Sequence, residues 1–216
     1  MFERYITRIR EYRYQKKGIK FLSLSKFEKA LFCFEKAILL NNSVQNIFYY
    51  SISLIALNRH LEAVSYLEPL MNEYSVELLI STTLLDCYLV LKEYDKANCL
   101  LDNLIVNYSD NTLLQKFYTI IKDPVLREKY SLSKEFFYQS IKYEKEHNYE
   151  AGYTAIKTAI ELDKNNATYH YTAGNLLLKA KKPKEDYVKY FEKAVILAPQ
   201  NEMYKKQLRH IKLMSK

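Results

Sequence analysis

Helix-breaking residues are scarce in this sequence, and Trp is absent. Only three Gly and four Pro occur among 216 residues, which argues against sandwiches, barrels and other folds rich in tight turns. No stretch approaches the roughly 20 apolar residues of a membrane-spanning helix, and the first ten residues lack the apolar run of a secretion signal. Because 49% of the residues are hydrophobic, the chain can bury a core. We therefore expect a soluble, cytoplasmic protein built of helices.

Cysteine and histidine are also infrequent. Cys33, Cys87 and Cys99 each lie in an apolar helical pattern, so we expect three buried, reduced thiols. A zinc site needs ligands at short, paired spacing, which neither the cysteines nor the four His have. The sequence also lacks a Gly-rich phosphate loop and a nucleophile, His and carboxylate set in a recognisable context. We predict no metal, no cofactor and no enzymatic activity.

Charge is distributed unevenly along the chain. Lys and Arg outnumber Asp and Glu by 9 to 3 in residues 1–30 and by 18 to 11 in residues 125–216. In residues 31–124 the acidic side chains prevail by 11 to 6. The net charge of +8 is therefore concentrated at two basic ends. Such runs are most often solvated helix faces, but they are also typical of proteins that bind nucleic acid.

One helical pattern recurs along the chain. In its clearest copy, Ala30 and Phe34 share a helix face, so that a neighbouring helix can approach closely over the small residue. Equivalent small residues follow at Ala63 and Ala97, at intervals of 33 and 34 residues. The next one, Gly152, comes 55 residues after Ala97. The spacing predicts repeated helical hairpins with one interruption.

The best-preserved copies also carry a motif on their first helix. The motifs are Tyr14-x2-Lys17-Gly18-x2-Phe21 before Ala30-x3-Phe34-x2-Ala37, and Ala173-Gly174-x2-Leu177 before Tyr187-x3-Phe191-x2-Ala194 and Pro199. They resemble the tetratricopeptide repeat (TPR), in which W-x2-L-G-x2-Y, A-x3-F and a late Pro recur about every 34 residues. The resemblance is strong in residues 11–44 and 133–201 and moderate in 45–111. It implies an all-α fold, a right-handed superhelical array of antiparallel helical hairpins (a TPR-like α-solenoid) with a capping helix at residues 202–214.

This register divides the chain into three expected parts. They are an N-terminal block of three TPR-like repeats (1–111), a degenerate partial repeat (112–132), and a C-terminal block of two repeats plus the capping helix (133–216). Asp123 and Pro124 form a good N-cap and first-turn pair, so we expect one helix to stop and another to start there. The pattern leaves open whether residues 125–147 form one helix or two joined near Ser131.

The resemblance implies a function in protein binding. Stacked hairpins line a concave surface with their first helices, and in the resembled family this groove usually holds a peptide or helix of a partner. We therefore expect a non-catalytic adaptor or scaffold. The register places these residues on the groove: Tyr12, Lys16, Ile19, Phe48, Tyr49, Ile52, Thr83, Asp86, Phe137, Tyr138, Ile141, Tyr171 and Asn175. Its aromatic side chains offer contact area to an apolar segment, or they simply fill space between helices.

Two other functions remain open at this point. Nucleic-acid or anionic-surface binding would use the basic ends, at Arg4, Arg8, Arg10, Arg13, Lys16 and Lys17 and at Lys205, Lys206, Arg209 and Lys212. A self-assembling scaffold, a homo-oligomer, would receive the N-terminal helix of one copy in the groove of another. Some members of the resembled family bind chaperone C-termini through Lys, Asn and Arg. The matching positions here hold Gln15, Ile19, Tyr49, Leu79 and Thr83, so this carboxylate-binding set is absent.

Overall fold

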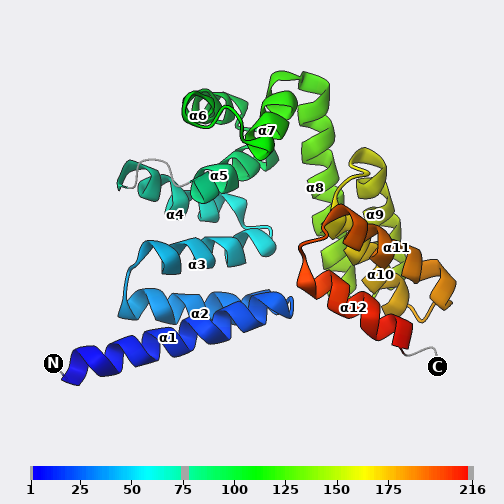
Figure 1. The fold of residues 1–216 in the computed structure, drawn as a ribbon, viewed down its shortest axis with the longest axis horizontal. Helices are drawn as coiled ribbons and strands as arrows, with labels where there is room; N and C mark the ends of the chain where they lie inside the picture. Colours follow the sequence, from blue (N-terminus) through cyan, green and yellow to red (C-terminus); the bar gives the residue numbers. More distant parts are fainter. Residues whose placement is uncertain (1, 74–77, 214–216) are drawn as a thin grey trace. The chain divides into compact units, whose positions relative to one another are not determined.

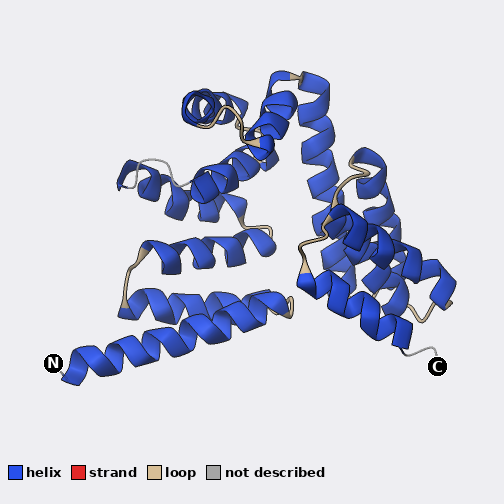
Figure 2. Cartoon of the chain, viewed as in Figure 1, coloured by secondary structure: helices blue, strands red, loops and turns tan. Residues whose placement is uncertain are grey.

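The computed structural model describes residues 2–73 and 78–213 (Figure 1). Every regular element within these ranges is an α-helix, and short turns join the helices (Figure 2). The chain forms two compact units that divide between Asp123 and Pro124. This agrees with the all-α hairpin fold that the repeat pattern predicts.

The first unit contains three helical hairpins and a closing helix. The hairpins are α1 (Phe2–Ser23) with α2 (Phe27–Leu40), α3 (Val44–Ala56) with α4 (His60–Glu73), and α5 (Leu78–Val90) with α6 (Tyr94–Asn107), and α7 (Thr112–Lys122) follows. The second helix of each hairpin packs on the helix that comes next, so that α2 contacts α3, α4 contacts α5, and α6 contacts α7. Each hairpin therefore covers one face of the following element.

The second unit contains two hairpins and a closing helix. They are α8 (Pro124–Lys145) with α9 (Tyr149–Leu162), α10 (Ala167–Lys179) with α11 (Lys184–Leu197), and α12 (Glu202–Leu213). Helix α12 is the expected capping helix, and residue 214 of that expectation lies outside the described residues. Helix α8 begins at Pro124 as predicted and runs unbroken through Ser131, which settles the open question in favour of one helix. The expected boundary after residue 132 falls inside α8, whereas the compact units divide nine residues earlier, at the start of α8.

The five hairpin turns share a backbone conformation that side-chain-bearing residues seldom adopt. Ser25, Asn58, Lys92, His147 and Lys181 all have φ between 54° and 61°. In each turn, the N–H of the next residue donates to the carbonyl five residues before it, at 2.8 to 3.1 Å, which closes the helix in a Schellman motif. These residues lie 33, 34, 55 and 34 positions apart. The spacing confirms the repeat register, including its one long interval.

In the first hairpin and in the last, a glycine of one helix lies in close contact with a phenylalanine of the other helix. A Cβ atom added to Gly18 of α1 would lie 2.6 Å from Cζ of Phe34 on α2. A Cβ atom added to Gly174 of α10 would lie 2.8 Å from Cε2 of Phe191 on α11. Both rings are fully buried, so neither has space to move away. The glycines therefore allow a helix approach that alanine would prevent.

A buried polar network joins the first two hairpins. Asn46 of α3 is fully buried, and its amide donates to Oε1 of Glu11 at 3.0 Å and to the carbonyl of Asn41 at 2.8 Å. Its side-chain oxygen accepts a hydrogen bond from Gln15 at 2.7 Å. Glu11 also accepts from the side-chain amides of Asn41 and Gln15, at 2.9 and 3.4 Å. The Glu11 carboxylate thus accepts hydrogen bonds at the interface between the first two hairpins.

We expect Gly18→Ala to destabilise the first unit. Alanine improves helix propensity by up to about 1 kcal/mol. Overpacking against Phe34 costs about 1–3 kcal/mol, so the net free energy of unfolding should fall. Urea unfolding followed by circular dichroism measures the change. In a Phe34→Leu background, which removes the clashing ring atoms, the same substitution should lose its penalty; an equal penalty in both backgrounds would contradict the contact.

We expect Lys181→Gly to stabilise the second unit. Lysine at a φ of 55° carries the cost of the left-handed conformation, and glycine does not. The free energy of unfolding should rise by roughly 1 kcal/mol. Lys181→Ala removes the same charge and keeps a Cβ atom, so it serves as the matched control and should give no gain. Equal stabilisation by both variants would show that charge, and not backbone conformation, is responsible.

Candidate interaction surfaces

The partner-binding residues predicted in the first unit differ in how far they are exposed. Tyr12 and Ile19 of α1 are 61% and 44% exposed, and Lys16 is exposed as well. Phe48 and Ile52 of α3 are half-buried. The remaining three are also half-buried: the ring of Tyr49 stacks on Phe34 with centroids 5.3 Å apart, Thr83 donates to the carbonyl of Leu79 at 2.7 Å, and Asp86 lies on the same helix as Thr83. Tyr49 of α3 therefore contributes to packing against the first hairpin.

The residues predicted in the second unit are half-buried throughout. They are Phe137, Tyr138 and Ile141 of α8 and Tyr171 and Asn175 of α10. The ring of Phe137 lies 5.2 Å from that of Tyr169, a fully buried side chain of the core. The ring of Tyr171 stacks on Tyr204 of α12 at 4.5 Å and meets Phe191 edge-on at 5.5 Å. These two rings pack inside their own unit, and a binding role for the set stays a prediction.

Further exposed apolar side chains occur at equivalent positions of the first unit. The repeat register relates Tyr12 of α1 to Gln45 of α3, Leu79 of α5 and Leu113 of α7, at intervals of 33, 34 and 34 residues. Leu79 is 56% exposed and Leu113 is 47% exposed. An exposed apolar residue thus recurs on three of the four helices. The repeat register that assigns Tyr12 to the partner-binding surface thus assigns Leu79 and Leu113 to equivalent positions.

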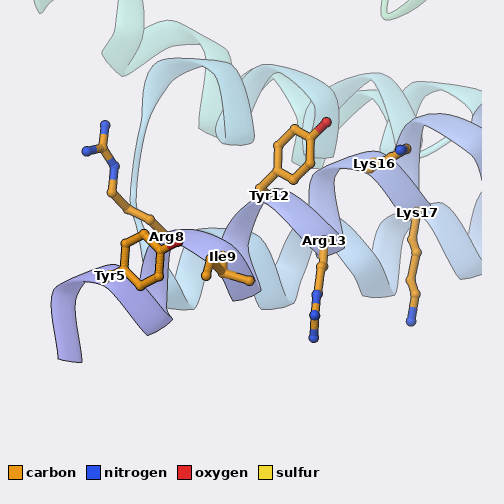
Figure 3. Close-up of a pocket in the computed structure, with 7 residues that line it drawn as sticks. All are labelled: Tyr5, Arg8, Ile9, Tyr12, Arg13, Lys16 and Lys17. Carbon is orange, nitrogen blue, oxygen red and sulfur yellow. The ribbon is translucent and has the colours of Figure 1, made fainter. Parts of the chain in front are cut away.

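A depression of about 630 Å³ follows the outer side of α1 (Figure 3). Its apolar lining comes from Tyr5, Ile9 and Tyr12. Its polar lining comes from four cations, Arg8, Arg13, Lys16 and Lys17. Figure 3 shows Arg13 and Lys17 extending to one side of α1 and Tyr12 to the other. Of these seven residues, only Tyr12 and Lys16 are among those that the repeat register predicts for the partner-binding surface.

A second depression, of about 460 Å³, lies between α1 and the C-terminal part of α2. Arg13 and Lys17 line it as well, together with Arg10 and Lys36. Its other lining residues are Tyr14, Leu39 and Leu40. No acidic side chain lines either depression. Arg13 and Lys17 thus line both depressions, and every charged residue that lines either one is a cation.

The second unit has a depression of the same size as the second one on α1, with mixed charge. Lys182 and Lys189 line it beside Glu150 and Asp186. Nζ of Lys182 lies 2.6 Å from Oε1 of Glu150, and this hydrogen bond lowers the pKa of the Glu150 carboxyl. The two lysines at this depression are thus balanced by two acidic side chains.

The two basic ends differ in how their charges are paired. On α12, Lys205 lies 2.8 Å from Glu202, Arg209 lies 3.8 Å from the same carboxylate, and Lys212 lies 2.7 Å from Glu192 of α11. On α1, by contrast, none of the seven Lys and Arg side chains forms an ion pair with any described residue. In sequence composition, the two ends share an excess of Lys and Arg over Asp and Glu. The structure shows that the positive charge of α1 is the less neutralised.

Possible reactive groups are few in the part of the chain that the structure describes. No three or more His, Cys, Asp or Glu residues are grouped there so that they could hold a metal ion. None of the described helices is both long and apolar enough to cross a membrane. Cys33 and Cys87 are buried as expected, but the expectation for Cys99 is wrong, because this residue is exposed. It lies two positions after Ala97 on α6, and hence on the side opposite the buried face.

Comparisons with known proteins identify the fold. No family model and no curated protein matches the sequence. The structure is similar to a chain of the Cut9–Hcn1 hetero-tetramer of the APC/C, with 16% identity and a TM-score of 0.50. That match covers 93% of this chain and 42% of the other, so this chain spans less than half of that relative. The structure is also similar to MamA from Desulfovibrio magneticus RS-1 (residues 41 to the end), with 16% identity and a TM-score of 0.45, over 89% of this chain and 97% of the other. A third similar structure is the TPR2AB domain of yeast Sti1 in complex with pHSP90, with 14% identity and a TM-score of 0.46, over 94% of this chain and 83% of the other.

The helical hairpins, their spacing and the structural likeness agree with one another. The chain has a TPR-like fold, an all-α solenoid of antiparallel helical hairpins. A fold of this kind presents surfaces for binding, and the function must be argued from the residues on those surfaces.

We expect iodoacetamide to modify Cys99 first in the folded protein. Cys33 and Cys87 are 4% and 0% exposed, and burial raises the pKa of the Cys33 thiol although the nearby Lys17 acts in the opposite direction. A buried thiol with a raised pKa presents little thiolate to the reagent. Peptide mass spectrometry should find one alkylated cysteine under native conditions and three in urea. Equal labelling of Cys33 in the folded state would contradict its burial against α1.

Proposed function

We propose that this protein is a non-catalytic adaptor that binds a peptide or helix of a partner protein across the first helices of its hairpins. The observation that carries the proposal is the recurrence of exposed apolar side chains at one register position, at Tyr12, Leu79 and Leu113. Isolated exposed apolar residues need no explanation, but a row repeated from hairpin to hairpin offers a continuous contact surface. A segment lying across α1, α3, α5 and α7 would meet one such residue at nearly every helix.

The neighbouring side chains support an amphipathic occupant. Phe48 and Ile52 are half-buried on α3 and add apolar surface beside the row. Lys16 and Asp86 provide one charge of each sign at its sides. Apolar anchors at the centre and charges at the rim are the usual anatomy of a protein-binding surface. The structural likeness to a chain of the Cut9–Hcn1 hetero-tetramer, an assembly of two proteins, is in keeping with this role.

Capture of partners from a lysate, after nuclease treatment, tests the proposal. Apolar contacts are weakly screened by salt, so partners should be retained at about 0.1 M and about 0.5 M NaCl alike. The combined variant Phe48→Ala, Leu79→Ala and Leu113→Ala should lose them. The control is Leu61→Ala with Val106→Ala, which truncates two apolar residues on α4 and α6 that are 67% and 81% exposed.

Quantitative mass spectrometry compares what the three proteins retain, and urea unfolding confirms that each is folded. The proposal expects a set of proteins bound by the wild-type chain and the control and absent from the triple variant. If the triple variant retains the same partners, or if the control loses them equally, the first-helix surface is not the binding site.

A further inference from the structure

We propose that helix α1, together with the adjoining end of α2, carries a binding site for single-stranded nucleic acid. The site consists of the two depressions along α1 and the six cations that line them, Arg8, Arg10, Arg13, Lys16, Lys17 and Lys36. We call this set the α1 basic surface. It shares Tyr12 and Lys16 with the proposed adaptor surface, and its other residues lie outside that surface.

The equivalent positions of α3 show how this surface differs from that of a helix between two hairpins. The register relates Arg13, Lys16 and Lys20 of α1 to Asn46, Tyr49 and Ser53 of α3, which lie 33 residues later. On α3 these positions face the preceding hairpin, since Asn46 and Ser53 are fully buried and Tyr49 stacks on Phe34. On α1, Arg13, Lys16 and Lys20 are exposed. Cations therefore occupy positions at which α3 has packing residues.

The charge of this surface is available to an external anion. None of its cations forms an ion pair with a described residue, although Glu11 lies on the same helix. The Glu11 carboxylate instead accepts hydrogen bonds from Gln15, Asn41 and Asn46 at the interface with the next hairpin. From Arg8 to Lys17 the helix rises about 14 Å, which matches a run of several phosphates. A polyanion would gain the full electrostatic attraction because no internal carboxylate competes for these side chains.

Two aromatic rings lie among these cations with their faces open. Tyr5 and Tyr12 are 64% and 61% exposed, and neither ring contacts another ring among the described residues. Other tyrosines of the chain are already paired, as Tyr49 is with Phe34 and Tyr171 is with Tyr204. Open rings within a basic groove are the platform on which the bases of a single strand stack. In a duplex the bases are already stacked on one another, so a single strand is the better fit.

The same features disfavour two other anionic partners. A membrane surface would require a continuous apolar stripe to insert, and on α1 the apolar residues Ile9, Tyr12 and Ile19 are interrupted by Lys16. An acidic protein segment would satisfy the cations but would leave the two open rings without a stacking partner. A nucleic acid strand supplies alternating phosphates and bases, and it therefore engages both kinds of side chain.

Fluorescence anisotropy with labelled oligo(U) of about 12 nucleotides tests the proposal. Neutralising four to six phosphates predicts a slope of about −3 to −4 in a plot of log affinity against log salt concentration. Between about 50 and 200 mM NaCl, affinity should therefore fall by about 60- to 250-fold. Oligo(dT), a duplex of equal length and poly-glutamate are measured alongside.

Two pairs of variants separate the charges from the rings. Arg8→Ala with Arg13→Ala and Lys17→Ala should weaken oligo(U) binding at least tenfold and flatten the salt slope by about 2. Its control, Lys205→Ala with Arg209→Ala and Lys212→Ala, removes three charges from α12, where they are paired with carboxylates, and should change binding little. Tyr5→Ala with Tyr12→Ala should weaken binding about tenfold at an unchanged slope, whereas Tyr5→Phe with Tyr12→Phe keeps the rings and should retain it.

Several results would overturn the proposal. Absence of salt-dependent oligo(U) binding would show that the α1 cations only keep an end face solvated. Equal losses from the α1 and α12 charge variants would show attraction to net charge alone. Tighter binding of poly-glutamate would assign the surface to an acidic protein, and tighter binding of the duplex would exclude the stacking role of Tyr5 and Tyr12. Neither protein capture nor its loss in the adaptor variants bears on these results.

Discussion

The close approach of two helices within a hairpin is the constraint on which the rest of this structure depends. Where Gly18 meets Phe34 and where Gly174 meets Phe191, a buried ring occupies the space that a Cβ atom would need. This contact sets the distance between the paired helices, and Ala30 and the other small residues of the second helices continue it along the stack. With that distance set, each first helix keeps one side free of its partner, and the proposed binding residues lie on first helices.

The hairpin turns make the stack regular at a cost in local strain. All five place a residue other than glycine in the left-handed conformation, and all five close the helix with the same backbone hydrogen bond. Because all five turns have the same conformation, the second helix leaves the first in a similar direction in every hairpin. Tyr12, Leu79 and Leu113 therefore occupy equivalent positions of their own helices, as the repeat interval in the sequence predicts.

Helices α1 and α12 are both rich in cations, but their environments differ. An interior first helix is covered by the preceding hairpin, so Asn46 and Tyr49 are used for packing and hydrogen bonding. Helix α1 bears exposed cations at the matching positions. The cations of α12 instead meet carboxylates of their own unit, such as Glu192 beside Lys212. The two helices therefore present different electrostatic fields to a partner, although both are rich in Lys and Arg.

The sequence by itself determined the helices, their pairing and the register, because these follow from local spacing: small residues at Ala30, Ala63 and Ala97, the repeat motifs of the first and last hairpins, and a helix break at Asp123 and Pro124. Only the tertiary structure decided that α8 is unbroken, that Cys99 is exposed, and that the rings of Tyr49 and Tyr171 are packed while those of Tyr5 and Tyr12 are open. It also decided which cations are paired. These properties depend on contacts between residues distant in the sequence, which spacing along one helix does not encode.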